Sequence, residues 1–262
     1  MVEKPPAARR VVLLGASNLS QGLATILATT RRVWNRPLDI LTADGRGRSY
    51  GMPSRLLGRG LSGITECGLW SALDESPRLP TAALVTDVGN DVMYGATADQ
   101  ILEWVRVCLD RLSRSDDVRL VVTGLPIARV EKLSPEQYLV LRSILFPRNR
   151  DDFASVVRRS QVVDAGLREL AARYGAAFVA APVEWYGADP IHIRRRLRPT
   201  VWNQVLSLWN EPSTVGDAVR VSIWNSIRAQ FWAPAERHVF SVVRRRRQPA
   251  IEYADGTRLS FY

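Results

Sequence analysis

The sequence predicts an α/β fold in which helices cover both faces of a five-stranded parallel sheet. Short runs rich in valine and leucine alternate along the chain with longer segments in which apolar residues recur at helical spacing. Successive strands that are joined through helices lie parallel, and the crossovers place those helices on the two faces of the sheet. A length of 262 residues, of which 46% are hydrophobic, suffices for one large domain with a sizeable core.

Each element follows from its own local pattern. The strands are expected at 11–14, 38–42, 82–86, 118–123 and 177–179. Helices are expected at 21–34, 99–112, 137–145, 153–174 and 199–209. Pro53 is expected to open another helix, because proline is tolerated in the first turn. Near the C-terminus, Asp255-Gly256 lies between two alternating runs and predicts a hairpin. We therefore expect an α/β domain at 8–232 and a C-terminal β-hairpin extension at 233–262, outside the main sheet.

The chain is strongly basic, with a formal net charge of +10 and a pI of about 10.4. Lys4 and Lys132 are the only lysines among 36 basic residues, so arginine replaces lysine almost everywhere. That form of bias favours a codon preference of the genome over a nucleic-acid surface. The arginine runs 194–196 and 244–247 are denser, and they keep open the alternative of an anionic partner.

Neither the cysteines nor the first residues indicate a secreted protein. Cys67 and Cys108 do not make a disulfide framework in a chain of this length. The apolar run 11–14 is too short for a signal-peptide core or a membrane span. We therefore expect a cytoplasmic protein without a transmembrane segment.

Four short segments carry groups that suit acyl transfer. They contain Ser17, Gly51, Asn90 and the pair Asp189 and His192, and they follow the first, second, third and fifth expected strands. The carboxyl ends of parallel strands meet at one edge of a sheet, where α/β proteins bind ligands. The sequence therefore predicts that a hydroxyl, two amide donors and an Asp–His pair meet at this edge.

Ser17 is the candidate nucleophile and His192 the candidate general base. Histidine is the usual base near neutral pH, and the chain holds only His192 and His238, of which His238 has no obvious partner. Asp189 precedes His192 by three residues, so on a turn its carboxylate can orient the imidazole. The plainer alternatives are a helix N-cap for Ser17 and a surface Asp–His pair.

The candidate oxyanion hole consists of the Ser17 and Gly51 backbone amides and the Asn90 side chain. Such donors stabilise the negative oxygen that develops during acyl transfer, and the N-terminus of a helix favours it further. Gly47 remains an alternative to Gly51, because both lie in the same glycine-rich loop. Asparagine and glycine are also common in ordinary turns.

Taken together, these segments resemble the SGNH hydrolases, also called the GDSL family of lipases and esterases. The matching blocks are Gly15-Ala16-Ser17-Asn18, the glycine at Gly51, Gly89-Asn90-Asp91 and Asp189-Pro190-Ile191-His192. The resemblance implies a flavodoxin-like three-layer α/β/α sandwich and a carboxylic ester hydrolase with a Ser-His-Asp triad, without cofactor or metal. The chain departs from the family at Ala16, where the family has aspartate, and it lacks the asparagine that precedes the glycine of the second block.

Other interpretations stay open. The same site could act as an acyltransferase, or the chain could be a non-catalytic relative that binds an anionic partner through its arginine runs. Arg194 and Arg195 closely follow the candidate base and could bind an anionic part of a small ester, because arginine binds carboxylates and phosphates well. The segment 134–150 is either a cover over the site or part of the core. No Gly-x-Ser-x-Gly turn surrounds Ser17, which argues against an α/β-hydrolase, and no Cys/His cluster indicates zinc.

Overall fold

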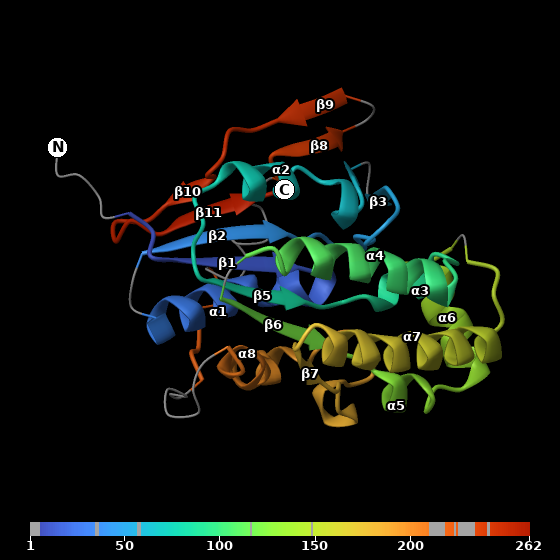
Figure 1. The fold of residues 1–262 in the computed structure, drawn as a ribbon. Coiled ribbons are helices and arrows are strands. Elements are labelled where there is room, and N and C mark those ends of the chain that lie inside the picture. The colour runs from blue at the N-terminus through green and yellow to red at the C-terminus, as the bar shows by residue number, and fades with distance from the viewer. Residues whose placement is uncertain are drawn as a thin grey trace.

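A seven-stranded sheet forms the centre of the protein, with helices on both of its faces (Figure 1). The computed structural model describes residues 6–34, 37–56, 59–115, 117–147, 149–209, 218–222, 224, 234–239 and 242–262. In sheet order the strands are β10 (Ile251–Glu252), β11 (Arg258–Phe261), β2 (Leu38–Ala43), β1 (Arg9–Leu14), β5 (Thr81–Val85), β6 (Val118–Thr123) and β7 (Ala177–Val179). The five expected strands lie side by side and parallel in the order β2-β1-β5-β6-β7. This is the flavodoxin-like order, so the predicted fold class is confirmed.

The helices alternate with these strands as expected. They are α1 (Ser17–Trp34), α2 (Leu69–Glu75), α3 (Gly89–Met93), α4 (Ala98–Leu112), α5 (Ile127–Val130), α6 (Pro135–Leu145), α7 (Phe153–Arg173) and α8 (Arg198–Ser207), with 3₁₀ helices η1 (Ile64–Glu66), η2 (Val183–Trp185) and η3 (Arg195–Leu197). In the described part of the chain, no helix has the length and apolar character needed to cross a membrane. The cytoplasmic location stays a prediction.

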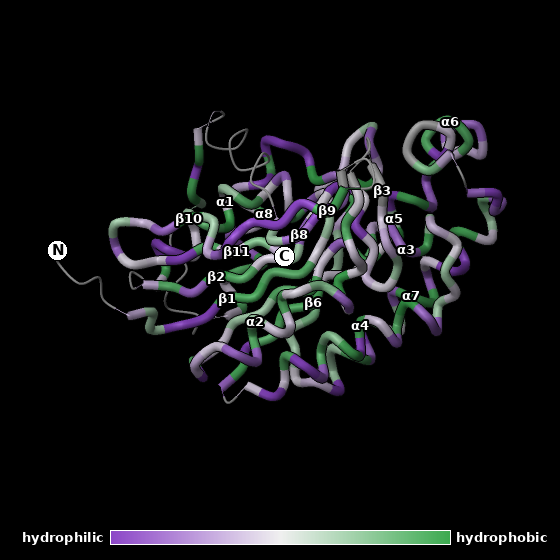
Figure 2. Tube along the Cα trace, turned by 90° about the horizontal axis from the view of Figure 1, so that it is seen from above, coloured by the Kyte–Doolittle hydropathy of each residue, from purple (hydrophilic) through white to green (hydrophobic). Residues whose placement is uncertain are grey.

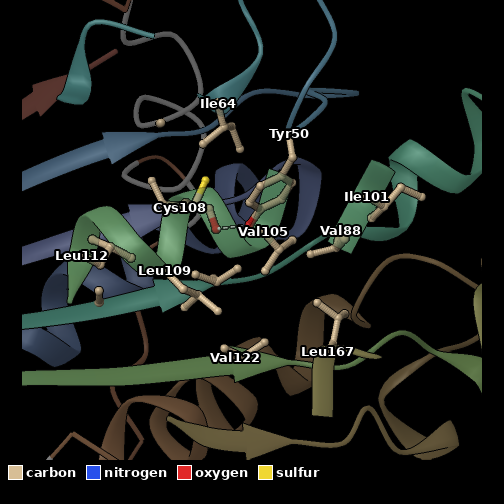
Figure 3. Packing of buried hydrophobic residues seen from close by; sticks show 14 of the residues in the cluster. Tyr50, Ile64, Val88, Ile101, Val105, Cys108, Leu109, Leu112, Val122 and Leu167 are labelled. Atoms are coloured by element: carbon tan, nitrogen blue, oxygen red, sulfur yellow. Dashed lines mark hydrogen bonds between the residues drawn. The ribbon is translucent and has the colours of Figure 1, made fainter. Parts of the chain in front are cut away.

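Two hydrophobic clusters hold the three layers together. Side chains alternate across a strand, so Val11 and Leu13 of β1 pack with α1 and α8 on one face. Val12 and Leu14 pack on the other face, with α2, α4 and α7. Figure 3 shows this second cluster, in which residues of α4 and α7 lie near Val122 of β6. Figure 2 shows the hydrophobic strands β1 and β2 running through the middle of the molecule, with more hydrophilic segments around them.

The chain after Pro53 does not form a helix, and that prediction is wrong. It forms a hairpin of β3 (Ser54–Leu56) and β4 (Arg59–Leu61). This hairpin joins β8 (Glu236–Val239) and β9 (Val242–Arg245) in a four-stranded antiparallel sheet. Proline favours the start of a helix only through its local backbone geometry. Here β4 of the hairpin pairs with β8, which comes from the far end of the chain, and this pairing stabilises strands instead. The arginine run 244–247 is exposed on β9 and just beyond it.

The C-terminal hairpin of β10 and β11 belongs to the main sheet, so the expectation that it lies outside that sheet is wrong. Strand β11 pairs in parallel with β2, from Arg258 beside Asp39 to Phe261 beside Thr42. Leu259 and Phe261 are buried, so the hairpin covers an edge of β2 that would otherwise stay unpaired. The expected domain boundary at residue 232 lies outside the described residues and stays a prediction.

A buried ion pair fastens three of these strands. Arg10 of β1 donates from Nε to Asp39 Oδ2 on β2 at 3.0 Å. Arg258 of β11 lies on the other side of the same carboxylate, with Nη2 at 3.5 Å from Oδ1. Both Arg10 and Asp39 are buried, and the charge of Asp39 is compensated by Arg10 and, at the longer distance, by Arg258.

Candidate active site

Ser17 is the first residue of α1 and follows the turn that ends β1. Gly15 permits this turn to lie against β5, because a Cβ at Gly15 would be 2.7 Å from Thr86 Cγ2. The Ser17 hydroxyl faces the ring of His192, with 3.0 Å between Oγ and Nε2. The structure therefore brings the candidate nucleophile and base into hydrogen-bond contact, although 175 residues separate them.

His192 is held on its other side by Asp189. The Nδ1 atom of the ring lies 2.6 Å from Asp189 Oδ2, and Asp189 Oδ1 accepts from the backbone N–H groups of Ile191 and His192. Partial burial acts to raise the pKa of Asp189, but the hydrogen bond from the His192 ring and the backbone bonds offset it and lower that pKa. An ionised Asp189 accepts a hydrogen bond from the Nδ1–H of His192, which leaves the Nε2 lone pair toward Ser17.

Asn90 lies in α3, beside the same cavity as Ser17. Its Nδ2 donates to the carbonyl of Arg48 at 3.3 Å, which places it against the loop that follows β2. Gly47 in this loop has a left-handed backbone with φ of 68°, and its carbonyl accepts from the Tyr94 hydroxyl. The predicted side-chain donor therefore contacts the loop at Arg48, the residue that follows Gly47.

The N–H of Gly51 is a backbone donor predicted for the oxyanion hole, but it already has an acceptor in the structure. This N–H donates to Ser49 Oγ at 3.2 Å. A Cβ at Gly51 would lie 1.9 Å from the Trp104 ring of α4, so a side chain cannot fit there. The Gly51 N–H thus already has an acceptor in its own loop, and neither Gly51 nor Gly47 lines the cavity, so the choice between them stays a prediction.

Asp91 fastens the loop after β2 to α3. It is completely buried and accepts from the Ser49 hydroxyl and from the Tyr50 N–H, the latter at 3.0 Å from Oδ2. Burial raises the pKa of Asp91 to about 6, although the bonds from Ser49 and Tyr50 act in the opposite direction. Because Asn90 is its neighbour, this contact also sets where the Asn90 amide lies relative to the loop.

A largely apolar cavity opens beside Ser17 and Asn90 at the carboxyl edge of the sheet. Its walls come from the segments around α5, α6, α7 and α8. They include Leu125, Ile127, Val130, Tyr138, Leu141, Phe146, Trp185 and Trp202. Within the described residues, no group of three or more histidine, cysteine, aspartate or glutamate side chains is arranged to hold a metal ion.

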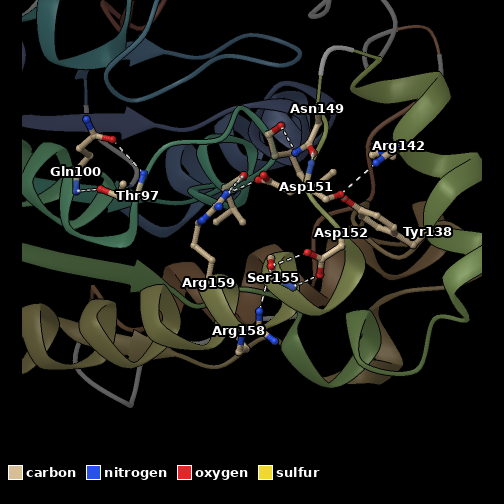
Figure 4. A network of polar contacts seen from close by, with 12 residues as sticks. Thr97, Gln100, Tyr138, Arg142, Asn149, Asp151, Asp152, Ser155, Arg158 and Arg159 are labelled. Carbon is tan, nitrogen blue, oxygen red and sulfur yellow. Dashed lines mark hydrogen bonds and ion pairs between the residues drawn. The ribbon is translucent and has the colours of Figure 1, made fainter.

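Helix α6 forms one wall of this cavity. Leu141 lines the cavity, whereas Leu139 and Val140 are 47% and 59% exposed on the opposite side of the helix. The Tyr138 hydroxyl donates to the carbonyl of Asp151 at 2.9 Å, which ties α6 to the start of α7 (Figure 4). The segment 134–150 thus covers the side of the candidate site rather than filling the core alone.

A polar network anchors the connection between α6 and α7 to α3. Asn149 Nδ2 donates to the carbonyl of Met93 at 2.7 Å. Arg159 of α7 donates to Asp151 Oδ2 at 2.7 Å and to the carbonyl of Val92 at 3.1 Å (Figure 4). These bonds join the wall of the cavity to the helix that carries Asn90.

Arg194 and Arg195 are exposed and lie outside the cavity lining. Arg194 packs beside Gly187, with Nε 3.3 Å from the position that a Cβ of Gly187 would take. Burial, together with the charges of Arg195 and Arg46, lowers the pKa of Arg198. The charges of Arg46, Arg195 and Asp189 thus all act on Arg198, and the two arginines make this side of the site positive.

Asn18 and Asp87 also belong to the site, although their sequence context assigned them no role. Asn18 Nδ2 donates to Asp87 Oδ1 and to the carbonyl of Ile191, each at 2.9 Å. The partners lie 69 and 173 residues from Asn18 in the chain. The position of Asn18 beside Ser17 is the only signal in the sequence, and a short polar residue near a turn is too common to predict such distant partners.

Several solved proteins resemble this structure at low sequence identity. One solved protein is 16% identical, with a TM-score of 0.53 over 77% of this chain and 96% of its own. The native aryl esterase of M. smegmatis is 12% identical, with a TM-score of 0.49 over 76% of this chain and 99% of its own. A member of the lipolytic protein G-D-S-L family from Veillonella parvula is 10% identical, with a TM-score of 0.47 over 76% and 97%. No protein-family model and no curated protein matches the sequence. At these identities the likeness concerns the fold alone, and the α/β fold expected from the resemblance in the sequence is the one that the structure shows.

Proposed function

We propose that the protein is a serine-dependent carboxylic ester hydrolase of the SGNH type. The observation that carries this proposal is the series of contacts from Asp189 to His192 at 2.6 Å and from His192 to Ser17 at 3.0 Å, beside an apolar cavity. An imidazole in this position takes the serine proton, while the carboxylate holds the ring and stabilises its positive charge.

The reaction follows from these contacts. Ser17 Oγ attacks the ester carbonyl carbon, and its proton moves to His192 Nε2. The tetrahedral intermediate expels the alcohol, which takes that proton and leaves an acyl group on Ser17. His192 then removes a proton from a water molecule, which attacks the acyl carbonyl. The bond from the acyl carbon to Ser17 Oγ breaks, Oγ takes the proton back from His192 Nε2, and the carboxylic acid is released. Asp189 stays ionised throughout, in agreement with its lowered pKa.

Three donors would stabilise the negative oxygen of each tetrahedral intermediate. The Ser17 N–H lies at the N-terminus of α1, where the helix dipole favours negative charge. Asn90 Nδ2 is the second donor. In the structure it donates to the carbonyl of Arg48 at 3.3 Å. We assign the third to the N–H of Gly47, because the N–H of Gly51 already donates to Ser49.

The cavity supports a small ester with an apolar group. Apolar side chains of α5, α6 and α8 line it, so an acyl chain or an apolar alcohol would lose its contact with water there. Arg194 and Arg195, which are exposed and lie outside the cavity lining, remain candidates for binding an anionic part of the substrate.

A series of nitrophenyl esters from acetate to decanoate tests the proposal. The wild type should hydrolyse them, and Ser17→Ala and His192→Ala should each lower kcat by about 1,000-fold or more. Ser113→Ala is the matched control, because Ser113 is an exposed residue at the end of α4 and should leave kcat unchanged. Full activity in Ser17→Ala would contradict the proposal. Product analysis with added alcohols separates hydrolysis from acyl transfer.

A further inference from the structure

The side chain of Asn18 joins the turn that carries Ser17 to the loop that carries His192. Asn18 Nδ2 donates to the carbonyl of Ile191 at 2.9 Å, and Asn18 Oδ1 accepts from the N–H of Ile193 at 2.8 Å. Ile191 and Ile193 are the chain neighbours of His192, so the backbone is held on both sides of the candidate base. A carboxamide supplies both the donor and the acceptor that these two bonds need.

Asp87 determines the orientation of the Asn18 amide. Its Oδ1 accepts from Asn18 Nδ2 at 2.9 Å, while its Oδ2 accepts from the N–H groups of Ala16 at 3.0 Å and Leu19 at 2.9 Å. With the amide turned over, Asn18 Oδ1 would face the Asp87 carboxylate and Nδ2 would face the N–H of Ile193. Both of those contacts are repulsive, so the carboxylate selects the orientation that the loop requires.

The backbone of Asp87 is itself in an unusual conformation. Its φ is 62°, in the left-handed region that aspartate and asparagine tolerate better than other residues with a side chain. This residue follows β5 and lies just ahead of α3, which carries Asn90. The Asp87 carboxylate therefore connects the segments of the nucleophile, the base and the oxyanion donor.

We propose that Asn18 is a positioning residue that holds His192 at proton-transfer distance from Ser17, and that Asp87 acts through Asn18. This inference rests on the proposed esterase function. The bonds of Asp189 to Ile191 and His192 connect groups of one loop, so they shape the loop without setting its distance from Ser17.

The loop needs this outside support because it is partly exposed. The side chain of His192 is 21% exposed and that of Asp189 is 51% exposed. A displacement of about 1 Å between reacting groups costs on the order of 100-fold in rate. Loss of the Asn18 bonds should therefore affect the chemical step more than substrate binding.

The Ile193 N–H reports on the Asn18 contact without any substrate. In NMR hydrogen exchange, this amide should be protected in the wild type and should exchange at least about tenfold faster in Asn18→Ala. The N–H of Val12 in the centre of β1 should exchange at the same rate in both proteins. Because His192 and His238 are the only histidines, a His238→Gln variant assigns the His192 ring signals, which should shift in Asn18→Ala.

Kinetics then test the effect on catalysis. Asn18→Ala should lower kcat for a nitrophenyl ester by about 100-fold, with KM within about threefold of the wild type. Thr97→Ala removes the exposed N-cap of α4 and serves as a destabilised control whose kcat should not change.

An exchange of side chains tests the coupling of Asn18 to Asp87. Asn18→Asp places two carboxylates against each other and should be slower than Asn18→Ala. Adding Asp87→Asn places an amide donor opposite the carboxylate introduced by Asn18→Asp. The kcat of the double variant should therefore be about tenfold higher than that of Asn18→Asp.

The inference is overturned if Asn18→Ala keeps the wild-type kcat, or if the double variant is no faster than Asn18→Asp. Unchanged exchange at the Ile193 N–H in Asn18→Ala would overturn it as well, whether or not the protein hydrolyses esters. A wild type that hydrolyses no ester, but whose Ile193 protection depends on Asn18, would overturn the proposed function and still support the link between the two segments.

Discussion

Replacing Asp91 with asparagine should flatten the pH dependence of stability. Asp91 is completely buried, where it accepts from the Ser49 hydroxyl and the Tyr50 N–H. Burial outweighs these bonds and raises the pKa of Asp91 from an ordinary 3.8 to about 6. The folded protein therefore keeps the Asp91 proton to a higher pH than the unfolded chain does.

The sign and size of the effect follow from this difference in pKa. Between pH 3.8 and about pH 6 the folded state binds more protons at Asp91, so the contribution of this group to stability falls as the pH rises. This stabilising contribution of Asp91 is fully present well below pH 3.8 and is lost above about pH 6. A difference of roughly two pKa units corresponds to about 3 kcal/mol.

Urea unfolding of the wild type and Asp91→Asn from about pH 4 to about pH 7 measures this contribution. The wild type should lose about 2 kcal/mol more than the variant over this range, because the range begins just above the lower pKa and the other carboxylates act equally in both proteins. Asp255→Asn is a control of opposite sign, because the pKa of Asp255 is lowered. Burial acts to raise that pKa, but the hydrogen bonds from Arg31 and Thr257 outweigh burial. The stability that Asp255 provides is lost as the pH falls. Parallel pH profiles for the wild type and Asp91→Asn would refute the reasoning.

Three further substitutions test other parts of the structure. Arg10→Ala should lower the free energy of unfolding by about 3 kcal/mol in a urea titration, because it leaves the buried Asp39 without its 3.0 Å partner; unchanged stability would contradict this. Gly51→Ala should lower the free energy of unfolding by at least about 2 kcal/mol, because the added Cβ would overlap the Trp104 ring. Adding Trp104→Leu should restore part of the Tm. A Gly51→Ala protein with wild-type stability would show that the loop has room for a side chain there. Leu141→Trp should shift kcat/KM toward shorter acyl chains in the ester series, and an unchanged chain-length preference would place the acyl group outside this part of the cavity.

The main sheet and the meeting of Ser17 with His192 could be predicted because both depend on local patterns. The run 11–14 is apolar throughout, as expected of a strand covered on both faces. Once strands alternate with helices, all strand ends that point the same way share one edge. Residues that follow the first and fifth expected strands therefore come together whatever their separation in the chain.

Contacts that depend on one particular distant atom could not be predicted. The glycines locate the loop after β2, but the sequence does not indicate that Ser49 and Tyr50 in this loop are bound by Asp91, 42 and 41 residues away. The roles of Asn18 and Asp87 depend on partners in other segments, so the side chains alone are not informative.

The same limit applies to the C-terminal hairpin. Asp255-Gly256 predicts the turn, because this pair favours the backbone conformation of a tight hairpin. Whether the hairpin joins the main sheet depends on the edge of β2 being open to β11, which no local pattern indicates.

The site of covalent labelling by a fluorophosphonate tests the central claim most directly. An activated serine oxygen attacks the phosphorus and displaces fluoride, so the probe stays attached to the nucleophile. Mass spectrometry of the labelled peptides should find the adduct on Ser17, and His192→Ala should abolish it. An adduct on another serine, or undiminished labelling of Ser17 in His192→Ala, would contradict the account.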